Sequence, residues 1–578
     1  MTSDINTKPS GQSELSRPWV HRSWCINLAL ILLIIGFLAN LCFLYFHCPF
    51  DLSEDESHYW DWSRHLDWGY YSKGPGIAAI IHLAVVVGQW FGQQHASMPV
   101  VRTPAVIFSF ISGLVGVVLS RRIFRDDRVS LMLIVLSAGM PIFAIGSLLI
   151  TIDSPMYCAW ALATLSIWLA IEPEWNESTV PPFVSLVPAR PFWLYAAGLF
   201  TGLGMLVKPV LLFIPFCVMF AAISNRFMRR RFSTRHAVGA MILTLLLQVP
   251  TLIWNAQHNW VMFRHIGGQG GLADSGGLIR HLTQMPLNVL VFMLSQVGIL
   301  IGIFFVLLIV AIIHAFRICR LKPDSYEALG WSFLLSFSLP IFAFYFILSF
   351  WTKVEPNWPA AGYFTAMIIL AGFALERWNE STKVSGYYRR AIVSGVAIGF
   401  TGLILFENIN HLYPIFGARY AQELVRLDPT SRLYGLRQRA LYIDKVRDQM
   451  AAMGGPKPLV IATRWDTASS LAFYLPDQPD VFCIESLLGQ RESQFDIWPG
   501  LNRVDPDTGK LYYFGANAVL TGSINLAAFN KLIKPAFQRI VSLPPIPLVY
   551  KDVVLKNLDV WECWGFKGFP QTTTTASY

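Results

Sequence analysis

Residues 51–76, DLSEDESHYWDWSRHLDWGYYSKGPG, combine acidic, aromatic and basic side chains directly after a long apolar run. Within this segment, Asp55, Tyr59 and Trp62 would lie on one face of a helix, at spacings of four and three residues. A carboxylate can accept a proton from a hydroxyl group, and aromatic rings stack on sugars. The pattern predicts a carboxylate beside an aromatic surface of the kind that stacks on sugars, at the boundary of a membrane.

Lys73 stands just before Gly-Pro-Gly at 74–76, a sequence that predicts a bend ahead of the next apolar segment. At that position its ammonium group could bind the phosphate of an anionic lipid. The alternative is ordinary for a lysine at a membrane interface, where the side chain simply extends its charge into water.

The two acids have a structural alternative as well. Ser53 precedes the acidic turn and Glu56 follows three residues later, which is the spacing of a capping box. In that arrangement Glu56 closes the start of the helix, while Asp55 faces the helix dipole and stays ionised. Catalytic and capping roles therefore both remain open for Asp55 and Glu56.

Three more charged residues stand at the ends of apolar segments: Asp153 in TIDSP, Lys208 in LVKPV and Lys353 in WTKVEPNW. A carboxylate at membrane depth costs roughly 2.5 kcal/mol or more, so Asp153 should face the protein interior or a water-filled cavity. It could also cap a helix that starts at Pro155. Lys208 and Lys353 either bind phosphate or extend into water.

The composition places these residues in a membrane protein. The chain has 578 residues, of which 54% are hydrophobic and 14% charged, and this excludes an ordinary soluble domain. A formal net charge of +9 fits basic cytoplasmic loops better than nucleic-acid binding. No Cys-x-x-Cys or Cys/His spacing predicts a metal site, so we expect no cofactor, although the outer acids leave metal dependence undecided.

Apolar segments suited to spanning helices occur near residues 24–46, 100–120, 129–150, 155–172, 192–207, 209–224, 237–254, 287–314, 328–350, 358–376 and 389–406. A further segment, 75–92, is ambiguous. If it crossed the membrane, the basic clusters 121–128 and 226–235 would lie on the side opposite the basic N-terminal tail, against the positive-inside rule. We therefore predict that 75–92 lies in the interface or re-enters, which leaves about eleven spans.

This topology predicts an all-α polytopic bundle of about 11–13 transmembrane helices with a small C-terminal extracytoplasmic α/β domain. The domains are a cytoplasmic tail (1–23), a transmembrane domain (24–406) with a first outer loop (47–99), and the α/β domain (407–578). All candidate residues then share the outer face. The segment 255–285 on that face is expected to be a mobile loop or lid.

The quoted segment resembles the first outer loop of the polytopic glycosyltransferases of the C superfamily (GT-C). The resemblance is to the group of dolichyl-phosphate-mannose protein mannosyltransferases and the aminoarabinose transferase of lipid A. It extends in order through RTPAVIFSFISGLVGVVLSRRIF, ITIDSPMYCAWALA, GLGMLVKPVLLFIPF, LIWNAQHNWVMFRHIGGQG, KVEPNWPAAGYF and FYLPDQPDVFCIESLLGQRESQFDIWPG. These segments cover nearly the whole chain.

The resemblance implies a role for each matching residue. The Asp-Glu pair of the family matches Asp55 and Glu56, with Asp55 as catalytic base or acceptor-positioning group, and Lys73 would meet the donor phosphate. Further donor-phosphate candidates are Lys208 and Lys353, and substrate-binding candidates are His58, Tyr59, Tyr71 and Asp153. This chain departs from the family at Ser57 and His58, where Arg or Tyr is common, and at Lys73, where many relatives have histidine.

The implied activity is transfer of a sugar from a polyprenyl-phosphate donor to a lipid, glycan or protein acceptor, with inversion of the anomeric centre. The implied location is an integral membrane protein of the bacterial inner membrane, active on its periplasmic side and surrounded by membrane lipids. A lipid-linked sugar flippase and an inactive lipid-binding relative remain alternatives. In an oxidising compartment, Cys483 and Cys563 could form a disulfide.

Overall fold

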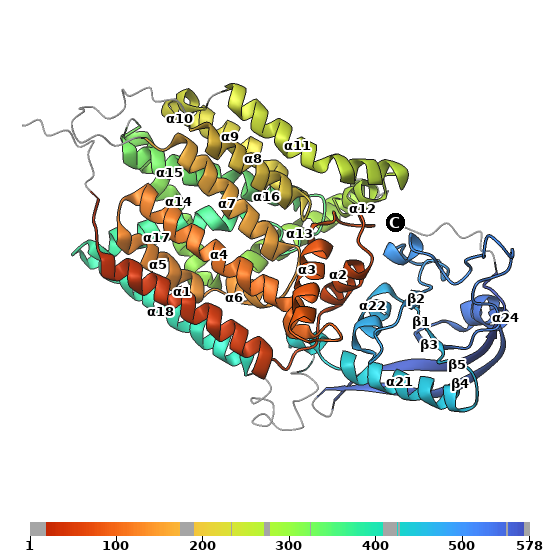
Figure 1. Cartoon of the computed structure of the whole chain (residues 1–578). Helices are drawn as coiled ribbons and strands as arrows, with labels where there is room; N and C mark the ends of the chain where they lie inside the picture. The colour runs from red at the N-terminus through yellow and green to blue at the C-terminus, as the bar shows by residue number, and fades with distance from the viewer. Residues whose placement is uncertain are drawn as a thin grey trace, which may run out of the picture.

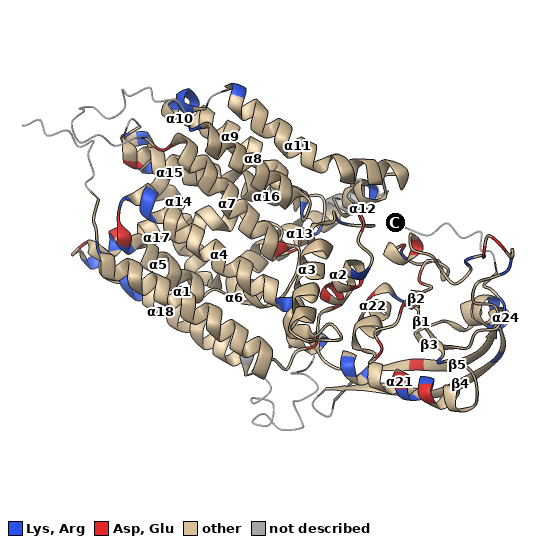
Figure 2. Cartoon of the chain, in the orientation of Figure 1, with Lys and Arg blue, Asp and Glu red and all other residues tan. Residues whose placement is uncertain are grey.

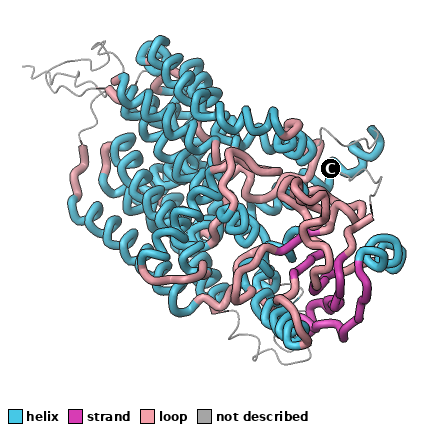
Figure 3. The backbone as a smooth tube through the Cα atoms, turned by 45° about the vertical axis from the view of Figure 1, so that its right-hand side comes forward, coloured by secondary structure: helices cyan, strands magenta, loops and turns pink. Residues whose placement is uncertain are grey.

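The structure, a computed structural model, describes residues 19–173, 190–232, 234–270, 278–323, 325–408, 425, 428–550 and 553–570. It consists of a large helical bundle and a smaller α/β domain at the C-terminus, joined at one end of the bundle (Figure 1). All strands of the described chain lie in the C-terminal domain, and loops gather where the two parts meet (Figure 3).

The bundle is built from apolar helices, most of them long, and one short arginine-rich helix at residues 226–231. They are α1 (Ser23–Cys42, continued by a π-helical turn Phe43–His47), α4 (Met98–Phe124), α5 (Asp127–Ala138), α6 (Pro141–Leu148), α7 (Asp153–Ile171), α8 (Pro191–Met205), α9 (Phe213–Ser224, after a 3-10 turn Pro209–Leu212), α10 (Arg226–Arg231), α11 (Thr234–Gln257), α14 (Ile301–Leu321), α15 (Tyr326–Ser336), α16 (Leu339–Leu348), α17 (Ala360–Asn379) and α18 (Lys383–Glu407).

The described helices fit a membrane bundle. Eight of them, counting α15 with α16 as one, are long and apolar enough to cross a membrane, and the bent pair α5–α6 makes a ninth. The shorter α8 and α9 pack in the same bundle, against α7 and α15 respectively. Up to nine described segments are therefore long and apolar enough to cross, and the predicted polytopic helical bundle is confirmed, while the count of about eleven spans stays a prediction.

Basic residues gather at the end of the bundle away from the C-terminal domain (Figure 2). There Arg122 forms an ion pair with Glu172, with 2.7 Å between Nη1 and Oε2, and Tyr326 Oη donates to the Arg122 carbonyl. Arg231 donates to the carbonyls of Ile171 and Glu172 at the same end. The C-terminal domain lies at the opposite end of the bundle.

Helix α3 (Gly76–Trp90) has 15 residues, too few to cross a membrane of ordinary thickness. Its start lies beside the end of α8, where the Gly76 N–H donates to the Leu206 carbonyl, and its last turn packs on Val100 at the start of α4. Both ends of α3 are therefore at the same end of the bundle. The prediction that 75–92 does not span is confirmed.

The single span predicted at 287–314 is wrong, and the loop or lid predicted at 255–285 is partly helical. The single span predicted at 287–314 is two helices, α13 (Leu278–Ile299) and α14, separated at Leu300 and followed by a positive φ of 59° at Ile301. Gln296 accepts a hydrogen bond from Tyr363 Oη (2.6 Å) and so ties the end of α13 to α17. The predicted lid contains a helix, α12 (Val261–Gln269), while residues 271–277 lie outside the described chain.

The C-terminal domain is an α/β unit, as predicted. Its five-stranded sheet has the order β2-β1-β3-β5-β4, with β2, β1 and β3 parallel and β5 and β4 added antiparallel. The strands are β1 (Leu459–Ala462), β2 (Val481–Cys483), β3 (Ala518–Gly522), β4 (Phe537–Tyr550) and β5 (Val553–Phe566). The helices are α21 (Leu436–Ala452), α22 (Trp465–Tyr474), α23 (Leu526–Ala528) and α24 (Lys534–Ala536), with short turns at Pro429–Leu433, Gln494–Asp496 and Phe529–Ile533.

The sheet order rules out the disulfide considered for Cys483 and Cys563. Cys483 lies on β2 and Cys563 on β5, with β1 and β3 between them. Three strand spacings amount to about 14 Å, whereas disulfide-bonded Cα atoms lie within about 7 Å. Both thiols are free.

Candidate active site

The candidate site lies where α2 (Glu54–Arg64) meets the outer end of the bundle and the C-terminal domain. Ser53 Oγ accepts the Glu56 N–H, and the Glu56 carboxylate accepts the Ser53 N–H at 2.8 Å. This is the capping box that the sequence predicts, and it starts the helix at a fixed point. Asp55, which lies between these two residues, is thereby held in the first turn of α2.

Glu56 is fully buried and its carboxylate is completely engaged. Its Oε2 lies 2.7 Å from Arg102 Nη2, its Oε1 accepts from Arg102 Nε at 2.8 Å, and the Ile150 N–H donates to Oε1 at 2.9 Å. Arg102 comes from α4 and Ile150 precedes α7. Glu56 therefore fastens α2 to two parts of the bundle, and the structure favours its capping role over a catalytic one.

Asp55, the residue before Glu56, has a different environment. Water reaches its carboxylate, which has neither a hydrogen bond nor an ion pair with any described residue. Protein atoms nevertheless crowd the group, and this burial raises the pKa of Asp55 above its usual 3.8. The positive charges of Lys73 and Arg491 oppose that rise, so Asp55 is a stronger base than the helix dipole alone would make it.

Lys73 faces the same space from the loop between α2 and α3. Burial is the main cause that lowers the pKa of Lys73 to about 8, and the like charge of Lys208 acts in the same direction. Within the described chain no carboxylate lies within 4 Å of its ammonium group. Gly74 fixes the loop, because any side chain there would collide with the Leu206 carbonyl. Lys73 is thus a half-buried cation with no anionic partner in the part of the chain that the structure describes.

Asp153 and Lys208 form an ion pair on the bundle side of Lys73. Lys208 Nζ lies 2.6 Å from Asp153 Oδ1, and Asn357 Nδ2 donates to Asp153 Oδ2 at 2.5 Å. Three segments meet here: the start of α7, the turn between α8 and α9, and the approach to α17. The ammonium of Lys208 already has a carboxylate partner, unlike that of Lys73.

His58 connects α2 to the C-terminal domain. Its Nε2 accepts the Trp62 indole N–H at 3.2 Å, so Nδ1 carries the proton and donates to Ser469 Oγ of α22 at 2.7 Å. Burial lowers the pKa of His58 to about 3 and keeps the ring neutral. Both ring nitrogens are engaged with protein, which favours a structural role over the predicted contact with substrate.

The aromatic face predicted on α2 is buried. Trp62 is completely inaccessible and stacks on Tyr70 with 4.5 Å between ring centroids, so its predicted stacking on a sugar is wrong. Tyr59 is 6% exposed and lies within the electrostatic reach of Asp55 and Asp153, and burial raises the pKa of its hydroxyl. Because α2 packs between the bundle and the C-terminal domain, its aromatic side chains are buried in that packing and are not exposed to a substrate.

Two further predicted residues lie at the edges of the site. Tyr71 is 3% exposed; its N–H donates to Gln494 Oε1 at 2.7 Å, which joins the first outer loop to the C-terminal domain. Lys353 is 66% exposed and paired with Glu355 at 2.9 Å. Its charge is not among those that act on Asp55 or Lys73.

The structure adds residues that the sequence did not single out. Arg102 orients Glu56, and Arg491 of the C-terminal domain acts electrostatically on both Asp55 and Lys73. No local spacing connects position 491 with position 55, since only the packing of the C-terminal domain on α2 brings them together. Among the described residues, no group of three or more His, Cys, Asp and Glu side chains could hold a metal ion.

Comparison with known proteins identifies relatives of this chain. Residues 72–254 match the family model of dolichyl-phosphate-mannose-protein mannosyltransferase. Lipid A galacturonosyltransferase RgtD of Rhizobium johnstonii is 24% identical over 361 residues, which span 61% of this chain and 67% of that protein. Both comparisons identify glycosyltransferases.

Two crystal structures of ArnT from Cupriavidus metallidurans share the fold. The apo structure superposes with a TM-score of 0.54 at 14% identity, covering 93% of this chain and 97% of ArnT. The structure bound to undecaprenyl phosphate gives 0.53 at 15% identity, covering 93% and 98%. The predicted GT-C fold, the resemblance and the assignment to glycosyltransferases are confirmed.

Proposed function

We propose that this chain, a membrane glycosyltransferase with the GT-C fold, transfers a sugar from a polyprenyl-phosphate donor to an acceptor hydroxyl at the outer face of the membrane. The observation that carries the proposal is the pairing of two unengaged charges. The Asp55 carboxylate and the Lys73 ammonium act on one another electrostatically, yet neither has an ion-pair partner in the described chain. One can accept a proton and the other can bind a phosphate.

The chemistry follows from these two groups. The acceptor hydroxyl oxygen forms a bond to the anomeric carbon of the sugar, while the bond from that carbon to the phosphate oxygen breaks. Asp55 takes the hydroxyl proton, for which its raised pKa suits it, and Lys73 stabilises the charge that develops on the departing phosphate. A single base opposite the leaving group favours inversion, and detection of the retained anomer in the product would contradict this stereochemistry.

The donor carrier and the location are part of the proposal. The solved relative named above contains undecaprenyl phosphate, which supports a polyprenyl carrier with its tail in the bilayer. The basic end of the bundle supports a cytoplasmic face opposite α2, so the site would lie on the periplasmic side of a bacterial inner membrane. The relative that acts on lipid A favours a glycolipid acceptor over a glycan or protein.

The test is transfer from radiolabelled polyprenyl-phosphate sugars in membranes that contain the wild type or Asp55→Asn, followed by fractionation of lipid, glycan and protein. Label in a new product with the wild type alone would support the proposal and reveal the acceptor. Label that crosses the membrane unchanged on its carrier would indicate a flippase. Label that neither moves nor transfers, with every donor tried, would leave an inactive lipid-binding relative.

A further inference from the structure

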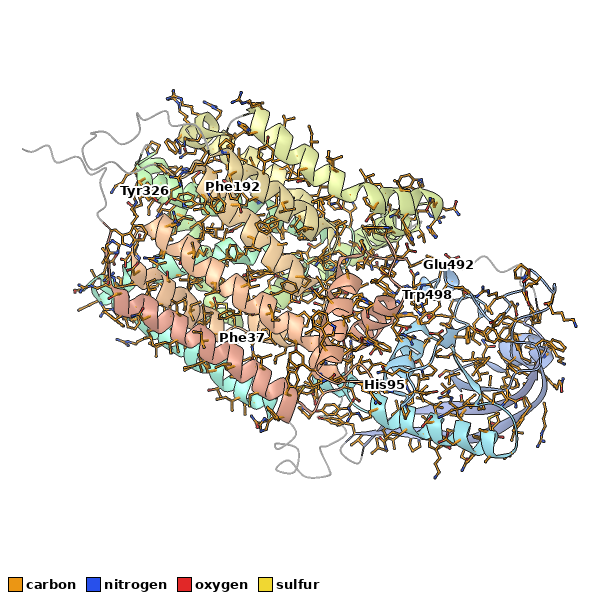
Figure 4. All side chains as sticks on the ribbon, viewed as in Figure 1. Phe37, His95, Phe192, Tyr326, Glu492 and Trp498 are labelled. Carbon is orange, nitrogen blue, oxygen red and sulfur yellow. The ribbon has the colours of Figure 1, made fainter. Side chains whose placement is uncertain are left out.

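The C-terminal domain reaches the candidate site through the segment 485–496. The Glu485 carboxylate accepts the Trp465 N–H at 2.9 Å, and Gln494 accepts the Tyr71 N–H at 2.7 Å. These two hydrogen bonds hold the segment at both ends, one on its own domain and one on the first outer loop. Arg491 lies between them, and its neighbour Glu492 is seen between the bundle and the C-terminal domain (Figure 4).

Arg491 is an exposed cation that pairs with no carboxylate among the described residues. Its guanidinium carbon lies 5.8 Å from the centre of the Trp465 ring, which supports the side chain from one side. In the described chain it forms no ion pair within 4 Å. The hydrogen bond from the Tyr71 N–H to Gln494 places this segment against the first outer loop, two residues from Lys73, and the charge of Arg491 acts on Asp55, Lys73 and His265.

His265 contributes a second, independent observation. It lies on α12, is 9% exposed, and its ring centre is 5.2 Å from that of Tyr71. Its Nε2 is buried and has no hydrogen-bond partner among the described residues. Burial lowers the pKa of His265 to about 3, so the ring is neutral and can present an N–H at this nitrogen. A buried polar atom of this kind is normally paired, and a ligand oxygen would pair it.

We propose that Arg491, His265 and Lys73 together bind one anionic oxygen group, a phosphate or a carboxylate, carried by a substrate. The three residues come from the C-terminal domain, α12 and the first outer loop. A guanidinium offers two parallel N–H donors, the imidazole offers one, and the ammonium supplies a compact charge. The C-terminal domain is then part of the substrate site. The proposal rests on the proposed function and adds two binding residues to it.

The anionic group could be the donor phosphate or an acidic group on the acceptor, and binding and kinetics distinguish the two. Purified Arg491→Gln and Arg491→Lys would be compared with the wild type for binding of undecaprenyl phosphate and for the KM of each substrate. Arg503→Gln is the matched control, because Arg503 is also an exposed arginine of the C-terminal domain, 5.5 Å from the Tyr512 ring. It should stay within about twofold of the wild type.

If the group is the donor phosphate, Arg491→Gln should weaken undecaprenyl phosphate binding roughly 10- to 100-fold, as expected for a lost charge-assisted hydrogen bond, with partial recovery in Arg491→Lys. If it belongs to the acceptor, that binding stays unchanged and the acceptor KM rises by the same factor. Arg491→Gln that matches Arg503→Gln in both measurements would overturn the proposal.

His265→Phe separates binding from folding. Removal of an unpaired buried nitrogen should leave the thermal midpoint unchanged or raise it, while weakening the same step that Arg491→Gln weakens. A lower midpoint with unchanged binding would assign His265 to the core and refute its part. A wild type that binds undecaprenyl phosphate but transfers no sugar would overturn the proposed function, while the binding comparison would still decide for or against Arg491.

Discussion

Lys208 Nζ lies 2.6 Å from the Asp153 carboxylate, so one of the lysines at the outer end of the bundle is already neutralised by a protein partner. Lys73, whose pKa the charge of Lys208 helps to lower, has no such partner in the described chain. This difference separates two lysines that the sequence could not distinguish. It favours a structural role for Lys208, and it supports the proposal that Lys73 binds a substrate anion.

Asp55→Asn should lower turnover roughly 10²- to 10⁴-fold, because the amide cannot accept the hydroxyl proton. Expression and the thermal midpoint should stay near those of the wild type, since the Asp55 carboxylate has no protein partner in the described chain. Glu54→Gln is the matched control: it changes an exposed acid of the same helical turn and should retain near-normal turnover. Equal activity of Asp55→Asn and Glu54→Gln would remove Asp55 from the mechanism.

The dependence of activity on pH should reflect the protonation of Lys73. Its protonated form binds phosphate, so kcat/KM for the donor should fall as the pH rises through about 8. Lys73→Arg keeps its charge to much higher pH and should lose this alkaline limb. On the acid side, activity should fall when Asp55 is protonated, at a pH above its ordinary pKa of 3.8. An alkaline limb that persists unchanged in Lys73→Arg would assign it to another group.

The buried pair of Glu56 and Arg102 should matter for stability. Glu56→Gln or Arg102→Met alone leaves an uncompensated charge or unpaired donors inside the protein, and should lower the free energy of unfolding by about 3–5 kcal/mol. The double variant Glu56→Leu/Arg102→Met removes both charges and should recover part of that loss. Thermal denaturation in detergent measures this. A Glu56→Gln protein with wild-type stability but no turnover would instead show that Glu56 acts in the chemistry.

A double-mutant cycle should detect the Asp153–Lys208 pair. Asp153→Asn and Lys208→Met each remove the ion pair, so their effects on stability should not add, with a coupling of about 0.5–3 kcal/mol. Lys353→Gln serves as the comparison, because its exposed pair with Glu355 is worth at most about 1 kcal/mol. Lys353→Gln should also leave the donor KM within about twofold. A large rise in that KM would restore Lys353 to the phosphate site.

Much of the architecture could be predicted without the structure. Long apolar runs and the placement of arginines predicted the bundle and a non-spanning 75–92, and the α/β domain followed from alternating runs after residue 407. The break at Leu300 was missed because residues 287–314 are mostly apolar. Gln296, just before the break, contacts Tyr363, which is 67 residues away in the chain, and local spacing does not predict such a contact.

The sequence by itself determined which residues could do chemistry, since a capping box, a lysine before Gly-Pro-Gly and acids at helix ends are local patterns. Only the tertiary structure decided which of them are available. Arg102 pairs with Glu56, Ser469 of the C-terminal domain hydrogen-bonds to His58, and Asp153 pairs with Lys208. Among the described residues, neither Asp55 nor Lys73 has such a partner. The partners that neutralise or hydrogen-bond these side chains are remote in the sequence. Local residue spacing therefore cannot predict which of the side chains has a partner.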